Sequence, residues 1–168
     1  MLAARRISGD RRLGTGRRIV CPMHFEGSVD IAAPRDRVWA FVIDPNQVGQ
    51  CGPGVESIEV NDATHFKATA KVGIGFISAR FNVEMEIAER EPPNRAVIKA
   101  HGQAPGSAVD GTATMSLRDG AEGGTAMDWA ADVMIGGSLA SVGARMIEGT
   151  ANKMITKTFD CIRTKLEA

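Results

Sequence analysis

The sequence predicts an α+β fold in which one long C-terminal helix lies across a strongly bent antiparallel sheet. From Val55 to Ile135 apolar residues recur with a period of two, and turn residues divide this region into six strands. After Gly136 the period becomes helical, and one apolar stripe continues to Leu166. The 168 residues have the length of a single domain with one core.

The region before residue 55 predicts one strand and two short helices. Residues 24–31 alternate between apolar and polar side chains, which is typical of a half-buried strand. Pro34 suits the first turn of a helix, which ends before Asp44. A second short helix over residues 45–50 leads into the turn formed by Cys51-Gly52-Pro53-Gly54.

Turn residues then separate the six further strands, and the chain closes with a helix. The turns are expected at Asn61-Asp62, Gly73 to Gly75, Glu91 to Asn94, Ala104 to Ser107 and Asp119 to Gly124. The apolar stripe of the closing helix comprises Leu139, Val142, Met146, Ile147, Met154, Ile155, Phe159, Ile162 and Leu166. We expect this stripe to form one uninterrupted helix of about eight turns.

Period-two alternation also assigns each strand residue to a face of the sheet. The inward positions carry only Phe66, Ala68, Ala70, Val72, Ile74, Ala79, Phe81, Val83, Met85, Ile87, Ala96, Ile98, Ala100, Gly111, Ala113, Met115, Leu117, Met127, Trp129, Ala131, Val133 and Ile135. The outward positions carry the charges, among them Lys67, Arg80, Glu84, Lys99, His101, Asp110, Asp128 and Asp132. The inward face is therefore predicted to contain no ionisable residue.

An ionisable-free inner face argues against catalysis. General acid–base and nucleophilic chemistry need a histidine, carboxylate, cysteine or lysine beside the substrate. The three histidines fall at polar positions, and Asp128 and Asp132 share a face without the histidine or cysteine ligands of a metal site. We therefore expect no catalytic residue, no metal and no cofactor.

The inner face is rich in alanine, glycine and methionine, which allows two interpretations. The side chains either fill a core or line an apolar cavity for a hydrophobic ligand, around which methionine can repack. If there is a cavity, the expected ligand-binding residues are Phe66, Phe81, Met85, Ile98, Met115, Met127, Trp129 and Met146.

Charge and cysteine spacing separate the N-terminus from the rest of the chain. Residues 1–22 contain six arginines and one aspartate, and we expect a disordered basic extension followed by a single domain over residues 23–168. The 20 basic and 20 acidic residues cancel, which excludes a global field that would attract nucleic acid. Cys21, Cys51 and Cys161 lie far apart, so neither a disulfide framework nor a zinc site is expected, and a reducing cytoplasm is predicted.

From Met23 onward the chain resembles the CoxG family, the G subunits of carbon monoxide dehydrogenase, within the START-like (Bet v 1-like, SRPBCC) superfamily. The motifs that carry the resemblance are Pro34-x-x-x-Val38-Trp39 with Asp44-Pro45, Cys51-Gly-Pro-Gly-Val-Glu-Ser-Ile58, Val72-Gly-Ile-Gly through Ala79-Arg80-Phe81, Glu91-Pro92-Pro93, and Gly149-Thr150-Ala151. The resemblance implies a helix-grip fold, in which a seven-stranded sheet surrounds the C-terminal helix and leaves a hydrophobic cavity between them.

The resemblance also implies a function. Members of the family accompany molybdenum hydroxylase-type dehydrogenases such as aerobic carbon monoxide dehydrogenase, are linked to their attachment to the membrane, and are proposed to bind quinone or lipid. No active-site motif carries over. We therefore expect a non-catalytic accessory protein that binds a quinone or lipid, partners such a dehydrogenase, and makes a peripheral contact with the inner face of the cell membrane.

Two alternatives stay open. The first is an enzyme of the cyclase, dehydratase or isomerase type that other START-like folds support. It requires an ionisable group inside the cavity, and His65, His101 and Asp128 are the candidates. The second is an assembly factor that docks a partner protein and holds no ligand.

Overall fold

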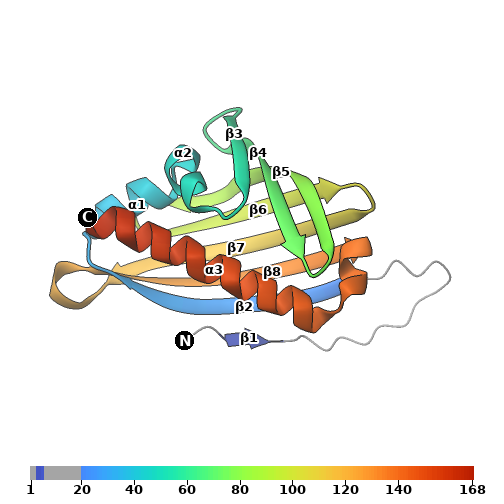
Figure 1. The fold of residues 1–168 in the computed structure, drawn as a ribbon. Coiled ribbons are helices and arrows are strands. Elements are labelled where there is room, and N and C mark those ends of the chain that lie inside the picture. Colours follow the sequence, from blue (N-terminus) through green and yellow to red (C-terminus); the bar gives the residue numbers. More distant parts are fainter. Residues whose placement is uncertain (1–2, 6–19) are drawn as a thin grey trace.

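The computed structural model describes residues 3–5 and 20–168, which form one curved antiparallel sheet with a long helix across its inner face (Figure 1). The strands lie side by side in the order β1-β2-β8-β7-β6-β5-β4-β3. Their bounds are β1 Ala3–Arg5, β2 Val20–Ile31, β3 Val55–Val60, β4 His65–Ile74, β5 Ile77–Glu91, β6 Arg95–Ala104, β7 Ser107–Asp119 and β8 Thr125–Gly137. The predicted seven-stranded sheet is confirmed as β2 to β8.

Strand β1 is an addition that the sequence did not predict. Ala3–Arg5 pairs with β2 at Glu26, Phe25 and His24. Strand β2 itself starts at Val20, so the expected domain boundary after residue 22 falls inside a strand. The rest of the basic extension, residues 1–2 and 6–19, lies outside the described residues.

Two short helices follow β2, as predicted. Helix α1 spans Arg35–Val42 directly after Pro34, and helix α2 spans Pro45–Val48. The Asp44 carboxylate caps α2 by accepting a hydrogen bond from the Asn46 backbone N–H at 2.9 Å. The predicted helix over residues 45–50 ends earlier, because the chain tightens into the 3₁₀ turn η1 at Gly49–Cys51.

The predicted C-terminal helix is divided in two. A 3₁₀ turn, η3, spans Ser138–Val142, and helix α3 spans Ala144–Glu167. Gly143 separates them with a φ of +101°, a left-handed value that glycine adopts readily. The stripe continued through this break because side chains at i and i+3 share a face in a 3₁₀ turn as well as in an α-helix.

The cysteine prediction was wrong. Cys51 in η1 and Cys161 on α3 form a disulfide, with their Cα atoms 5.4 Å apart, and Cys21 is free. Spacing along the chain could not reveal this pair, because only the packing of α3 against η1 brings the two thiols together. The argument from cysteine spacing to a reducing cytoplasm therefore fails.

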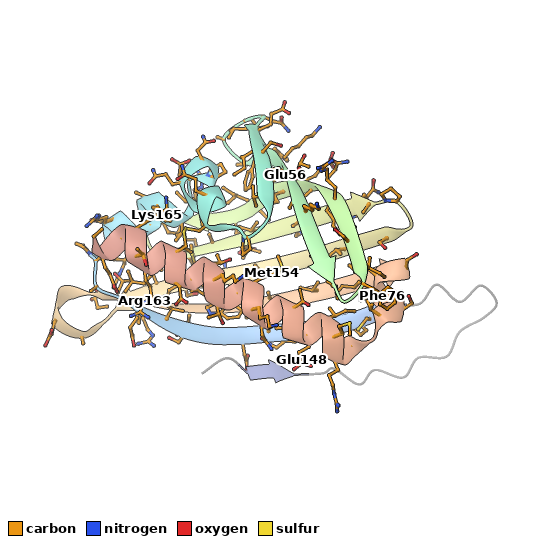
Figure 2. The ribbon with its side chains drawn as sticks, viewed as in Figure 1. Glu56, Phe76, Glu148, Met154, Arg163 and Lys165 are labelled. Atoms are coloured by element: carbon orange, nitrogen blue, oxygen red, sulfur yellow. A yellow bond between two sulfur atoms is a disulfide. The ribbon has the colours of Figure 1, made fainter. Side chains whose placement is uncertain are left out.

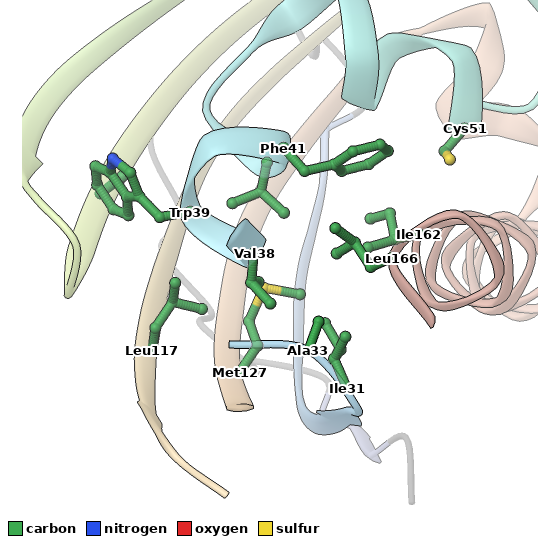
Figure 3. Close-up of a cluster of buried hydrophobic side chains, with 12 residues drawn as sticks. Ile31, Ala33, Val38, Trp39, Phe41, Cys51, Leu117, Met127, Ile162 and Leu166 are labelled. Atoms are coloured by element: carbon green, nitrogen blue, oxygen red, sulfur yellow. The ribbon is translucent and has the colours of Figure 1, made fainter. Parts of the chain in front are cut away.

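Side chains on the inner face pack into two separate apolar clusters, one near each end of α3. The first, shown in Figure 3, joins α1 and the C-terminal half of α3 to the sheet; it includes Ile31, Val38, Phe41, Leu117, Met127, Ile162 and Leu166. The second joins η3 and the N-terminal half of α3 to the sheet; it includes Met23, Phe25, Ile74, Phe81, Ile135, Leu139 and Ile147. The fold therefore has a core at each end of its long helix.

Candidate hydrophobic ligand site

Between the two clusters lies a strip of inner-face residues that belongs to neither. We call it the apolar floor; it consists of Phe66, Ala68, Met85, Ile98, Ala100, Ala113 and Ala131. Strand register makes the strip continuous: Phe66 pairs with Met85 and Met85 with Ala100, while Ile98 pairs with Ala113 and Ala113 with Ala131. The floor therefore crosses five strands, from β4 to β8.

Helix α3 does not fill the space above this floor. Its main close approaches are to β2 and β4 on either side of the sheet and to η1. On the floor, Ala113 is exposed, and Met85, Ile98, Ala100 and Ala131 are only half-buried. A packed core would bury all of these side chains. The sequence left two interpretations open, a filled core and an apolar cavity. The uncovered alanines favour the cavity.

An open seam lies between β2 and α3. It is a hollow of about 320 Å³ lined by Gly27, Ser28, Val29, Asp30, Trp129, Thr156, Phe159, Asp160 and Arg163. The Trp129 and Phe159 rings lie 5.3 Å apart between their centroids and form an aromatic wall. Gly27 permits this arrangement, because a Cβ atom there would lie 3.0 Å from the indole of Trp129. Trp129 is two residues from Ala131 on the same face of β8, so the seam adjoins the floor.

Asn152 is a polar group near this site that sequence reasoning missed. Its Oδ1 atom is buried, and no described residue donates a hydrogen bond to it. Asn152 lies two turns before Phe159 and thus on the same side of α3. Buried amides normally have partners, so this amide is available to bind a polar group of a ligand. In the sequence, Asn152 is only a polar residue beside the apolar stripe of the helix. Such residues are common, so the sequence could not single it out as a ligand-binding residue.

The eight expected ligand-binding residues fall into three groups. Phe66, Met85 and Ile98 belong to the floor. Met115 and Met127 pack in the cluster with α1, whereas Phe81 and Trp129 pack in the cluster with η3. Met146 lies apart from the others: it is 45% exposed, and its sulfur covers Gly75 at the turn between β4 and β5.

The three residues that the sequence offers as candidates for acid–base chemistry, His65, His101 and Asp128, lie on the opposite face of the sheet. His101 bonds to Asp110, and Asp128 pairs with Arg118 at 2.7 Å, which holds the pKa of that carboxyl below its usual range. A wide hollow of about 710 Å³ on this outer face is lined by charged residues, among them His65, Glu84, Lys99, His101, Asp110 and Asp132. His65, His101 and Asp128 therefore point away from the floor, whereas Asp160 and Arg163 of α3 line the seam.

His24, also on the outer face, has an elevated pKa. Its Nδ1 lies 2.7 Å from Asp132 Oδ1, and its Nε2 lies 3.2 Å from Glu26 Oε2. The hydrogen bond to Asp132, followed by that to Glu26, raises the pKa of His24 above 6.5. Sequence reasoning placed no histidine near Asp132, because strand pairing across 108 residues brings the two together.

Asp132→Asn is expected to lower the pKa of His24 toward its ordinary value, because it removes the charged hydrogen-bond partner that contributes most to the elevation. A raised folded-state pKa stabilises the fold fully below the unfolded pKa, and the contribution disappears as pH rises through the folded pKa. The variant should therefore lose thermal stability relative to wild type at pH 5.5 and little at pH 8.5. NMR titration of the His24 ring protons measures the pKa directly, and an unchanged value would contradict this assignment.

Comparison with known proteins identifies related sequences and folds. The family model for CoxG, the G subunit of carbon monoxide dehydrogenase, matches residues 27–167. No curated protein sequence matches the chain. A conserved protein from Geobacillus kaustophilus superposes with a TM-score of 0.80 at 22% identity, covering 86% of this chain and 95% of that one.

Two further solved structures share the fold at lower similarity. A START superfamily protein from Mycobacterium smegmatis has a TM-score of 0.63 at 14% identity, covering 86% of this chain and 97% of that one. The Zhui aromatase/cyclase from Streptomyces sp. R1128 has a TM-score of 0.63 at 14% identity, covering 87% and 94%. The fold is thus the START/Bet v 1-like arrangement that the resemblance implied.

Proposed function

Because this chain belongs to the CoxG family of carbon monoxide dehydrogenase, we propose that it binds a hydrophobic small molecule, a quinone or a lipid, between α3 and the apolar floor. The observation that carries the proposal is the incompletely covered floor between two packed clusters. An apolar surface that the protein leaves uncovered is stabilised when a ligand displaces water from it.

The composition of the site sets the chemistry of the ligand. Burial of apolar ligand area contributes about 25 cal/mol per Å², so a long or flat hydrocarbon gains most. The Asn152 Oδ1 atom can accept one hydrogen bond from a polar head group. The indole of Trp129 borders the seam. An apolar body with a small polar end, as in a quinone or a lipid, matches this distribution.

We further propose that the protein serves a molybdenum hydroxylase-type dehydrogenase as a non-catalytic accessory at the inner face of the cell membrane. The family name associates it with carbon monoxide dehydrogenase. The placement of His65, His101 and Asp128 on the outer face supports a binding role over a cyclase-type reaction on the floor. Within the described part of the chain, no helix has the length and hydropathy that crossing a bilayer requires.

Native mass spectrometry of protein purified from a quinone-producing bacterium tests the binding proposal. We expect an excess mass that organic extraction releases and that denaturing spectra identify as one quinone or lipid per chain. We also expect added ligand to raise the melting temperature of the extracted protein, because a ligand that binds only the folded state stabilises it. An empty protein that no quinone or lipid stabilises would contradict the proposal and favour the ligand-free assembly factor.

A further inference from the structure

The edge of strand β2 is only partly covered. Strand β1 pairs with His24, Phe25 and Glu26, and Figure 1 shows it beside the middle of β2. The residues that follow, from Gly27 to Ile31, pair with β8 on one side and with no described strand on the other. The C-terminal part of β2 therefore has one free edge.

The backbone groups of Ser28 and Asp30 point to this free edge. Neighbouring residues of an antiparallel strand direct their N–H and C=O groups to opposite sides. The carbonyl oxygen of Ile31 is on the β8 side, because a Cβ atom at Gly124, just before β8, would lie 2.9 Å from it. By alternation, Asp30 and Ser28 direct their N–H and C=O groups away from β8.

The same edge already binds a hydrogen-bond acceptor at its end. The N–H of Ala32, which directly follows β2, donates a hydrogen bond to the Glu167 carboxylate at 3.0 Å. With β1 at Glu26 and this carboxylate at Ala32, the edge is occupied on both sides of Ser28 and Asp30. Unpaired backbone groups at a strand edge are a template on which a further strand can pair.

The free edge forms one wall of the seam, and α3 forms the other. Residues 27–30 of β2 line it, and Phe159, Asp160 and Arg163 line it from α3. Figure 2 shows Arg163 on the side of α3 that lies over β2. A groove between a strand edge and a helix has the shape that an extended peptide fills when it adds to a sheet.

The charges of the seam favour a basic segment. Asp30 and Asp160 are both exposed, and neither forms an ion pair within the described part of the chain. The nearby basic side chains are engaged elsewhere: Arg163 lies 3.6 Å from Glu167, and Arg118 binds a different carboxylate at 2.7 Å.

We propose that the free edge of β2 binds an extended, basic segment of a partner protein by strand addition. The main chain of the segment bonds to the backbone of Ser28 and Asp30. Its side chains alternate, so that apolar ones enter the seam toward Trp129 and Phe159, and a basic one lies opposite Asp30 on the outer face. A hydrophobic small molecule would leave the row of backbone groups unpaired, whereas a peptide main chain pairs them. This inference goes beyond the proposed function, which concerns the floor beneath α3.

Selection from a random-peptide phage library tests this surface, with wild type as the bait and Ser28→Pro for counter-selection. Proline removes the N–H that faces the edge and leaves the hydrogen bonds to β8, which come from the neighbouring residues. We expect wild type to enrich peptides in which apolar and basic residues alternate. A synthetic copy of a selected peptide should bind Ser28→Pro about tenfold more weakly, as expected for the loss of one hydrogen bond. Ser28→Ala is the matched control, because it keeps the N–H, and it should bind as wild type does.

A chemical change in the peptide tests the mode of binding without altering the protein. N-methylation of the peptide amides that face β2 should abolish binding, whereas N-methylation at the alternate positions should not. In NMR hydrogen exchange, the peptide should protect the amides of Ser28 and Asp30. The amides of Gly27 and Val29, which face β8, should exchange at an unchanged rate.

A charge reversal tests the expected partner chemistry. Asp30→Lys should weaken peptide binding, because it places a like charge opposite the basic residue. Glu59→Lys makes the same change at an exposed position of β3, the strand at the other edge of the sheet, and should have no effect.

Three results would overturn the proposal. They are the absence of any peptide enriched over Ser28→Pro, binding that is insensitive to N-methylation, and a wild-type dimer that Ser28→Pro dissociates, which would assign the edge to a second copy of this chain. The ligand site fails separately. A protein that selects peptides but holds no quinone or lipid would contradict only the proposed function, and one that holds a ligand but enriches no peptide would contradict only this inference.

Discussion

Replacing Cys161 with serine is expected to lower the free energy of unfolding by about 2 to 5 kcal/mol. The disulfide connects residues 110 positions apart, so it restricts the unfolded chain over most of its length. It also fixes the C-terminal half of α3 to η1, one of the supports that hold the helix over the sheet. Urea unfolding followed by circular dichroism under non-reducing conditions measures the difference between the two proteins.

Reduction supplies the matched control for this variant. Dithiothreitol should shift the unfolding midpoint of wild type to that of Cys161→Ser, while the variant itself should not respond. Cys21→Ser keeps the disulfide and should remain as sensitive to dithiothreitol as wild type. Equal midpoints for oxidised wild type and Cys161→Ser would show that the disulfide contributes nothing to stability.

The sheet was predictable because strand faces follow from local alternation. Phe66, Met85 and Ala100 were assigned to one face from sequence parity, and strand register places them in one row across β4, β5 and β6. Features that depend on tertiary approach were not predictable. Strand β1 is three residues long, too short to show a period, and the disulfide joins segments that meet only after α3 has packed.

The candidate site was predictable in part for a related reason. Parity indicates which side chains face inward, and it correctly indicated that this face is apolar. It does not indicate where the covering helix comes closest to the sheet. The sequence therefore assigned Ala113 and Met127 alike to the inward face. In the structure Ala113 is exposed on the floor, whereas Met127 is 2% exposed and packs in a cluster. Met146 belonged to the helical stripe, yet the folding of the hairpin over the start of α3 places it outside the site.

Ala113→Trp is expected to abolish binding of an apolar probe while leaving the fold intact. Ala113 lies on the floor and is exposed, so an indole at this position would occupy the space proposed for the ligand. Overpacking a filled core costs about 1 to 3 kcal/mol, but an indole that enters an empty space avoids most of that cost. Titration with the fluorescent probe N-phenyl-1-naphthylamine should show affinity reduced about tenfold or more, and thermal unfolding should show a melting temperature close to that of wild type.

Thr112→Trp is the matched control, because Thr112 is the preceding residue of β7, is exposed, and points to the outer face. It introduces the same side chain into the same strand and should bind the probe as wild type does. Two results would contradict the site: unchanged probe affinity in Ala113→Trp, or a loss of stability of several kcal/mol. The second would mean that α3 packs directly on the floor, so that the residues between the two clusters complete a single core. Because the two variants differ only in the face that carries the indole, their difference in affinity reports which side of the sheet holds the ligand.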